Sequence, residues 1–561
     1  MNAMFAGIAF TVVFSIPALV REIRLARRFD RPPAVRGSSA MMNAHRMPTL
    51  GTAAGGLLAV GAMVGAGLLV VPSVAPSPRT VEVRAIQLVD TADSPLGDGT
   101  ALVFDGSGIP IPPPQAVDAA DTLYLQPLGF TGTAQSAFEP NGAYPLTGPH
   151  SLGIDTSLGQ DQQIMISDIE SQIAGGGVSP ENPVVVFGYS QSSEAASLIM
   201  PQLQAAGVPS DDVHFVLVGD PQNPNGGFLN TFDFPAGNTS AFTAFDASFL
   251  PATPSDLYPT DIYTLEYDGF ADFPHYTTNL LSDLNGLVGS FLAHFTYLDL
   301  TPDQINSAIL LPGSEALTGE GLTDYFMIPN DNLPILEPLL LIPGIGQPLY
   351  DLLEPDTRIL VNLGYGSITE GWNQGPANVP TTFGLFPDID QTQLSEALSN
   401  GWQQGVTDAL HDLQNPISYQ DQVAPLQLFA NALHTTFGVA PENPSFTDAV
   451  DGLLKLFGFP LSDVTLSSSP TEIINDISAT LSYDYSATLP FADAVNVLLT
   501  SLPAYDANIV TDQLDAGNFL GAILDPISAN TALVPYDLTL GVAPALIATV
   551  GTFVNLAELF S

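Results

Sequence analysis

The sequence has no cysteine and very few basic residues. Without cysteine, disulfide bonds, thiolate nucleophiles and cysteine-ligated zinc sites are excluded. Only 11 lysines and arginines accompany 58 aspartates and glutamates, which leaves a formal net charge of −47. An acidic body of this kind repels phosphate backbones, so nucleic-acid binding is excluded and attraction to anionic lipid head groups is not expected. The seven histidines lack the spacing of metal sites, and we predict no metal and no other cofactor.

Charged residues make up only 12% of the chain, about half of the usual share, so the surface must be mostly neutral and polar. The 49 prolines and 49 glycines indicate many turns and long ordered loops rather than an array of long helices. At 561 residues the chain is long enough for about two to three domains and a full-sized hydrophobic core.

The basic residues are concentrated at the N-terminus, where seven of the eleven precede residue 47. They lie between two apolar segments, 3–20 and 50–71, and the second is long enough to span a membrane. Arginine-rich loops stay on the cytoplasmic side, so this order predicts that the acidic body lies outside. Alternatively, a methionine at 41, 42 or 47 is the true start, and 50–71 is a secretory signal or anchor with a cleavage region near 74–77. Both interpretations predict an exported body.

The most informative segment is Pro183–Leu198. An apolar strand is followed by a sharp turn, Gly188–Ser192, and then by a helix rich in small residues. This arrangement is typical of the nucleophile elbow of α/β-hydrolases, in which small neighbours let the turn expose the central serine. The helix N-terminus behind Ser190 adds partial positive charge and free backbone N–H groups. We therefore predict that Ser190 is a catalytic nucleophile.

Strand and helix patterns alternate from residue 101 onward, which predicts a parallel sheet with its site at the carboxyl ends of the strands. The expected strands are 101–104, 184–187, 213–219 and 262–267, and the expected helices include 161–172 and 280–292. Beyond about residue 412, amphipathic segments alternate with serine and proline breaks. We expect them to form a mostly helical extension that packs on the hydrolase rather than a free domain.

A nucleophilic serine needs a histidine base and a carboxylate that orients it, and α/β-hydrolases carry them in the order Ser, Asp, His. We choose His294 as the base, because it follows a predicted helix, and keep His275 as the alternate. Asp268 and Asp272 both follow the carboxyl end of a strand. We choose Asp272 as the acid and keep Asp268, interpreted as a turn or N-cap residue, as the alternate.

An oxyanion formed at the substrate carbonyl needs hydrogen-bond donors beside the nucleophile. The residue after the serine supplies one, so we predict the backbone N–H of Gln191. The second donor is expected in the glycine-containing turn after the first strand, Asp105–Gly108, where Ser107 is the best candidate.

Four motifs in the chain resemble those of the PE-PPE domain family, and they occur in the expected order between residues 101 and 410. The motifs are Gly188–Ser192, Gly219–Gly227, Tyr267–Pro274 and Leu363–Gly366. The family is similar to cutinases and other serine esterases of the α/β-hydrolase fold. The resemblance therefore implies a serine esterase or acyltransferase that acts on lipid esters at the envelope of mycolic-acid-bearing bacteria.

Two shorter stretches also resemble cutinases: His294–Tyr297 matches their H-x-x-Y, and Ala271–Asp272 resembles the G-D that precedes the histidine. The chain departs from these families in several respects. It lacks the cutinase disulfides, it has Ser192 where a glycine is common, and an apparent anchor takes the place of the N-terminal PE or PPE module. The resemblance does not reach the tail after residue 412.

The predicted fold class is α/β: a cutinase-like α/β-hydrolase with a parallel sheet, N-terminal transmembrane segments and a mostly helical C-terminal extension. The predicted domains are an anchor or signal region over 1–76, the hydrolase over 77–411 and the extension over 412–561. The predicted function is that of an exported, membrane-tethered serine esterase or lipase, whose partners are a lipid or acyl-ester substrate and the membrane. Two alternatives stay open, an acyltransferase that builds envelope glycolipids of the trehalose type and a non-catalytic cell-surface scaffold.

Overall fold

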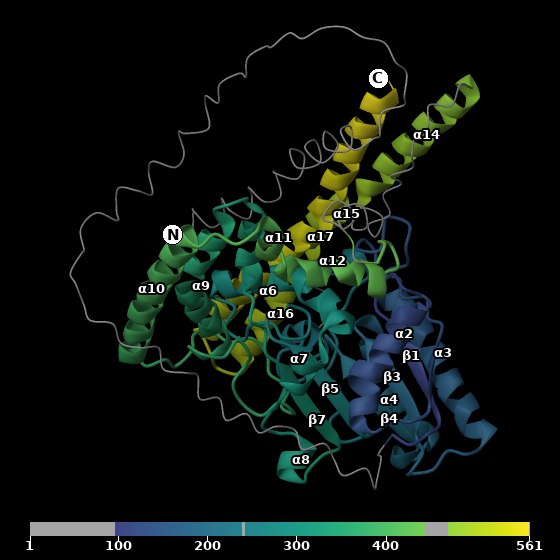
Figure 1. Ribbon diagram of the computed structural model, residues 1–561. Coiled ribbons are helices and arrows are strands. Elements are labelled where there is room, and N and C mark those ends of the chain that lie inside the picture. Colours follow the sequence, from purple (N-terminus) through teal and green to yellow (C-terminus); the bar gives the residue numbers. More distant parts are fainter. Residues whose placement is uncertain (1–95, 238–241, 443, 445–468, 560–561) are drawn as a thin grey trace. The chain divides into compact units, whose positions relative to one another are not determined.

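The computed structural model describes residues 96–237, 242–442, 444 and 469–559. Its centre is a seven-stranded sheet with the strand order β2-β1-β3-β4-β5-β7-β6 (Figure 1). The strands are β1 (Thr100–Phe104), β2 (Thr133–Ser136), β3 (Val184–Tyr189), β4 (Val213–Val218), β5 (Thr260–Leu265), β6 (Ile309–Leu310) and β7 (Thr323–Ile328). The four strands expected from the sequence correspond to β1, β3, β4 and β5.

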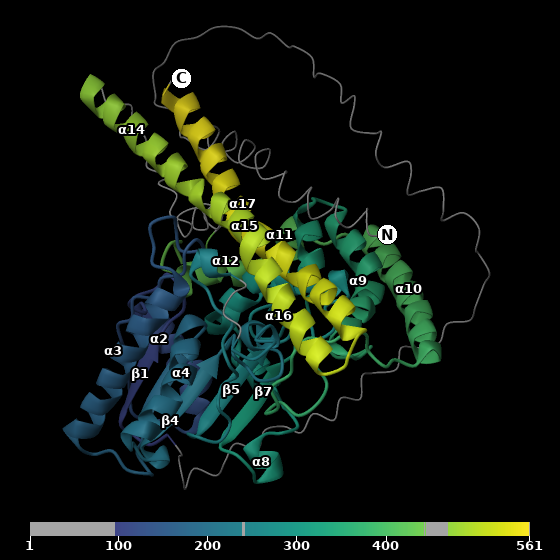
Figure 2. The same ribbon diagram turned by 180° about the vertical axis from the view of Figure 1, so that it is seen from behind.

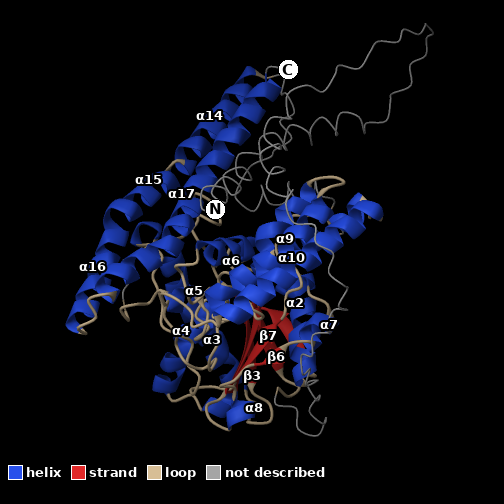
Figure 3. Ribbon diagram, turned by 90° about the vertical axis from the view of Figure 1, so that its left-hand side faces the viewer, coloured by secondary structure: helices blue, strands red, loops and turns tan. Residues whose placement is uncertain are grey.

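The central strands are buried on both faces, which explains their nearly continuous apolar sequences. In β3, Val185 and Phe187 belong to the core on one face, and Val184 and Val186 belong to the core on the other. Successive side chains of a strand point to opposite sides, so both sets must be apolar when helices cover both faces. Helices do flank the strands on both sides (Figure 3).

Two groups of helices form these covering layers. Helices α3 (Ile154–Gly175) and α4 (Gln191–Ala206) contribute Met165, Ile169 and Ile199 to one core. Helix α2 (Pro114–Ala120) and the 3₁₀ helix η5 (His294–Asp299) contribute to the other. The remaining α-helices up to residue 435 in the described part of the chain are α5 (Phe228–Thr231), α6 (Leu280–Leu292), α7 (Pro302–Asn306), α8 (Glu315–Thr318), α9 (Gly346–Asn362), α10 (Gln391–Gln414), α11 (Tyr419–Gln422) and α12 (Pro425–Thr435).

The fold class predicted from the sequence needs two corrections. The sheet is mixed, because the edge strand β6 pairs antiparallel to β7. Only a short connection containing α8 links these two strands, and a parallel pairing would require a longer crossover. The second correction concerns the transmembrane segments: none of the helices in the described residues is long and apolar enough to cross a membrane. The segments 3–20 and 50–71 lie outside the described residues.

The C-terminal tail is helical and packs on the hydrolase, as expected. Besides α11 and α12, its described α-helices, seen from behind in Figure 2, are α14 (Pro470–Ala487), α15 (Leu489–Asn496), α16 (Leu502–Asp515) and α17 (Gly521–Leu559). One hydrophobic core joins the tail to the loops beyond the sheet: Tyr536 of α17 stacks on Phe228 at 4.5 Å between ring centroids. Tyr505 of α16 donates a hydrogen bond to the carbonyl of Phe232. The predicted boundary at 411/412 falls inside α10, which packs along α9.

Candidate active site

Ser190 lies in the turn between β3 and α4, as the elbow pattern predicts. Its backbone has φ 55° and ψ −117°, a left-handed conformation that L-residues rarely adopt and that exposes the side chain. The turn is tight: a Cβ at Gly188 would come within 3.1 Å of the backbone of Ser192. A Cβ at Gly106 would lie 3.1 Å from the Cβ of Ser190 itself. Small residues are therefore required both before the serine and in the loop that faces it.

His294 reaches Ser190 from a distant part of the chain. It begins η5 directly after α6, and it is 1% exposed. The hydroxyl of Ser190 donates to its Nε2 at 2.7 Å. On the other side of the ring, Nδ1 donates to the carboxylate of Asp268, 2.8 Å from Oδ2 and 3.0 Å from Oδ1. A serine, a histidine and a buried carboxylate thus form one chain of hydrogen bonds, the geometry of a serine-hydrolase triad.

The carboxylate beside His294 is therefore Asp268, the alternate, and not Asp272, which we chose from the sequence. Asp268 is fully buried and also accepts hydrogen bonds from the Tyr297 hydroxyl at 2.8 Å and the Phe270 N–H at 2.9 Å. These two donors orient the Asp268 carboxylate so that it accepts the Nδ1–H of the His294 imidazole. The hydroxyl of Tyr189 fixes the histidine from another side by donating to the carbonyl of His294.

Asp272 serves the turn instead. Its Oδ2 accepts the backbone N–H of Tyr267 at 2.9 Å, its Oδ1 has no partner, and among the described residues it has no hydrogen bond to His294. Burial, and then the charges of Glu266 and Asp268, raise the pKa of its carboxyl well above the usual range. His275, the alternate base, packs against Tyr276 and Gly384 and is not joined to Ser190.

Both residues predicted for the oxyanion site lie beside the nucleophile. The Ser107 hydroxyl donates to Oε1 of Gln191 at 2.8 Å, which ties the loop after β1 to the start of α4. The Gln191 side chain is held further by Gly142 and Asp161. Neither backbone N–H, of Ser107 or of Gln191, has a hydrogen-bond partner within the described part of the chain. Two free backbone donors next to a nucleophile can stabilise an oxyanion.

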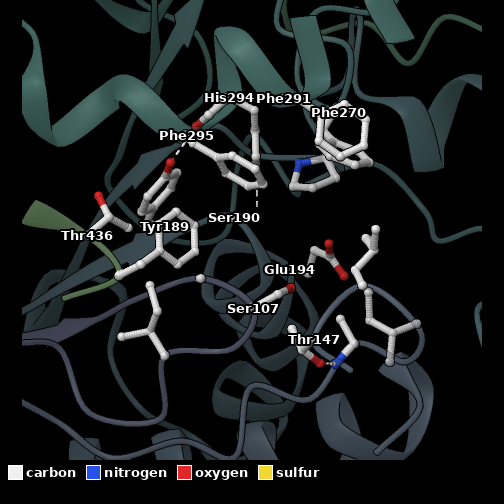
Figure 4. A pocket seen from close by; sticks show the side chains of 17 residues that line it. Ser107, Thr147, Tyr189, Ser190, Glu194, Phe270, Phe291, His294, Phe295 and Thr436 are labelled. Atoms are coloured by element: carbon white, nitrogen blue, oxygen red, sulfur yellow. Dashed lines mark hydrogen bonds between the residues drawn. The ribbon is translucent and has the colours of Figure 1, made fainter. Parts of the chain in front are cut away.

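A pocket with about 740 Å³ of empty space, part of it open to solvent, adjoins Ser190 and His294 (Figure 4). Most of its wall is apolar. The apolar lining residues are Ile109, Ala143, Leu146, Ile154, Pro221, Phe270, Phe291, Phe295 and Phe437. Thr436 and Phe437, which follow α12, come from the tail. Such a wall suits a hydrocarbon chain. The described residues contain no group of histidine and acidic side chains that could hold a metal ion.

Comparisons with known proteins identify the family of this chain. Residues 131–366 match the model of the PE-PPE domain. An uncharacterized PPE family protein of Mycobacterium tuberculosis, PPE28, is 36% identical over 473 residues, which cover 82% of this chain and 67% of that protein. This chain belongs to the PE-PPE domain family. The matched domain contains Ser190, Asp268 and His294, whereas Ser107 precedes it and the helical tail follows it.

Two relatives of the family have names that state an activity. Esterase PE16 of Mycobacterium tuberculosis is 40% identical over 309 residues, and the chain spans about half of its length. Diacyltrehalose acyltransferase Chp2 of the same organism is 26% identical over 219 residues, which cover 37% of this chain and 57% of that protein. The domain and these two relatives support an esterase- or lipase-like function.

Sequence reasoning missed two parts of the site. The motif His294–Tyr297 was used to support the histidine, but its spacing also places the Tyr297 hydroxyl on the Asp268 carboxylate. A buried tyrosine three residues after the base is a signal that could have identified this contact. Nothing in the sequence indicates that Phe437 lines the pocket, because α12, which precedes it, contacts η5 only in the folded chain.

Proposed function

We propose that this protein is a serine esterase that hydrolyses carboxylic esters of acyl lipids through an acyl-serine intermediate. The observation that carries the proposal is the continuous chain of hydrogen bonds from Ser190 through His294 to Asp268 at the edge of an apolar pocket. A scaffold protein would need no such geometry. The esterase activity in the name of PE16 supports the same conclusion.

In the proposed mechanism, Oγ of Ser190 attacks the ester carbonyl while Nε2 of His294 takes its proton. Asp268 keeps the imidazole in the tautomer that can accept this proton and stabilises the imidazolium that forms. The backbone N–H groups of Gln191 and Ser107 donate hydrogen bonds that stabilise the negative charge on the carbonyl oxygen. The histidine then protonates the leaving alcohol. Water, activated by the same histidine, releases the acyl group from the serine.

The test is a comparison of Ser190→Ala with Ser197→Ala. Ser197 lies on the same helix, is buried and bonds to the Ser193 carbonyl and to Thr253, outside the triad. We expect Ser190→Ala to lose hydrolysis of p-nitrophenyl esters and labelling by a fluorophosphonate probe while it keeps its thermal unfolding transition. Ser197→Ala should keep both signals. Labelling or hydrolysis that persists in folded Ser190→Ala would contradict the proposal.

A second candidate is acyl transfer to a sugar hydroxyl, which the similarity to Diacyltrehalose acyltransferase Chp2 favours. Both reactions share the acyl-serine and differ in whether water or another hydroxyl attacks it. Product analysis with an acyl ester and trehalose separates them: acylated trehalose would establish transfer, and free fatty acid alone would reject it.

We further propose that the hydrolase works outside the cytoplasmic membrane, as the arginine-rich N-terminal stretch led us to expect. Fractionation of cells that express the full chain tests this location. Recovery of the protein only in the cytosolic fraction would contradict it.

A further inference from the structure

One carboxyl group of the pocket has no role in the triad. Glu194 lies on α4, and its backbone N–H donates to the carbonyl of Ser190 at 3.2 Å, so it is one helical turn from the nucleophile. It lines the pocket together with Ser107 and Ser190 (Figure 4). The side chains of Glu194 and Ser190 therefore face the same cavity. Glu194 is therefore close enough to contact a substrate bound at Ser190.

The Glu194 carboxyl is buried without a partner. The residue is 3% exposed, its Oε2 has no hydrogen-bond partner, and neither carboxyl oxygen is bonded to another described residue. A buried polar atom without a hydrogen bond is rare in a folded protein and needs an explanation. Arg358, the one lysine or arginine among the described residues, pairs with Glu354 instead.

Burial, and then the nearby charge of Asp220, raise the pKa of Glu194 well above its usual range. The shift favours the protonated carboxylic acid, which has one O–H donor and one carbonyl acceptor. A hydroxyl group, itself both donor and acceptor, is its natural complement. The pocket holds a second buried polar atom without a partner, the Thr436 hydroxyl, in a wall that is otherwise mostly apolar.

We propose that Glu194 is a specificity-determining residue, which binds a hydroxyl group located a few bonds from the scissile ester carbonyl. The substrate class that fits is an ester of a polyol, such as a partial glyceride or a sugar ester. The inference rests on the proposed esterase function and deepens it. The apolar wall takes the hydrocarbon chain, and Glu194 distinguishes a hydroxyl-bearing ester from a plain alkyl ester.

The experiment compares two butyrate esters that differ only in the alcohol, propyl butyrate and 2,3-dihydroxypropyl butyrate, with the full chain. We expect kcat/KM to favour the dihydroxypropyl ester by about 10-fold or more, because a site built to bond a hydroxyl rejects the analogue that lacks it. Glu194→Gln, which keeps a donor and an acceptor, should retain most of this ratio. Glu194→Met, with nearly the same length and no polar group, should reduce it to near one. A general loss of activity cancels in the ratio.

The matched control is Asp283→Leu, since Asp283 is equally buried and neither of its carboxyl oxygens has a partner, but it does not line the pocket. This variant should keep the wild-type ratio. An equal rate for the two esters in the wild type, or an unchanged ratio in Glu194→Met, would overturn the inference and leave the esterase function intact. Loss of folding in both Glu194→Met and Glu194→Leu would also overturn it, because the carboxyl would then be structural. Failure of the wild type to cleave either ester would instead refute the proposed function.

Discussion

Replacement of the two candidate acids by asparagine separates their roles. Asp268 accepts hydrogen bonds from His294, Tyr297 and the Phe270 N–H at its two oxygens. Asparagine offers only one oxygen, and its amide group would donate to Nδ1 of His294. That contact favours the tautomer whose proton is on Nε2, where it cannot accept the proton of Ser190.

The expected loss for Asp268→Asn is about 10⁴-fold in kcat, the size found when the wrong tautomer is imposed on a serine-hydrolase triad. This corresponds to about 5 kcal/mol of transition-state stabilisation. Asp272→Asn is the matched control. Burial shifts the pKa of Asp272 upward, toward the neutral form that asparagine resembles, and an asparagine oxygen can still accept the Tyr267 N–H. We expect Asp272→Asn to stay within about 10-fold of the wild type.

The assay is the steady-state hydrolysis of a p-nitrophenyl ester, with thermal unfolding as the measure of folding. Asp268→Asn should unfold cooperatively and bind substrate with a KM close to that of the wild type, since the change acts on proton transfer. The reasoning is refuted if folded Asp272→Asn loses as much activity as Asp268→Asn. It is also refuted if Asp268→Asn retains more than about a tenth of the wild-type kcat.

Three further predictions concern pH, the histidine and the tail. Burial raises the pKa of Asp105 from 3.8 to about 7, so its contribution to stability is fully present below about pH 4 and is lost as pH rises through 7. Urea unfolding at a series of pH values measures this effect: in Asp105→Asn the change in the free energy of unfolding between about pH 4 and pH 7 should be smaller by up to about 4 kcal/mol. The same pH dependence in Asp105→Asn and the wild type would contradict the prediction. A Cβ at Gly219, where φ is +58°, would lie 3.1 Å from Cε1 of His294, so Gly219→Ala should lower kcat by about 100-fold in a folded protein. Tyr536 is only 4% exposed and lies in the core that joins the tail to the hydrolase. Tyr536→Ala would leave a cavity there and should lower the free energy of unfolding by about 3–5 kcal/mol. Tyr485→Ala, at a 72% exposed position of α14, is the control that should leave it unchanged.

Local sequence was sufficient to identify the nucleophile. A strand followed by a tight turn and a helix is encoded within Pro183–Leu198, because the small residues that the turn needs are neighbours in the chain. The strands β1, β3, β4 and β5 were also predictable, since burial on both faces requires continuous apolar sequences. His294 could be selected because few histidines follow the strand-end acids.

Tertiary structure alone decided which acid meets the histidine. Asp268 and Asp272 follow the same strand, and both become buried. Tyr267, with a left-handed φ of 68°, starts the turn. Asp268 accepts hydrogen bonds from the Phe270 N–H and from the Tyr297 hydroxyl of η5. The two aspartates are only four residues apart in one loop, so the sequence does not indicate which carboxylate faces His294 at the start of η5.

The direction of β6 and the composition of the pocket wall were likewise decided by tertiary structure. A two-residue edge strand has too little sequence to show its pairing, which its contacts with Met327 and Phe326 of β7 determine. Phe437 reaches the pocket only because α12 packs against η5. Glu194 reads in the sequence as an ordinary acidic residue in the first turn of a helix. Its burial without a partner beside Ser190 exists only once β3, α4 and the loop after β1 have come together.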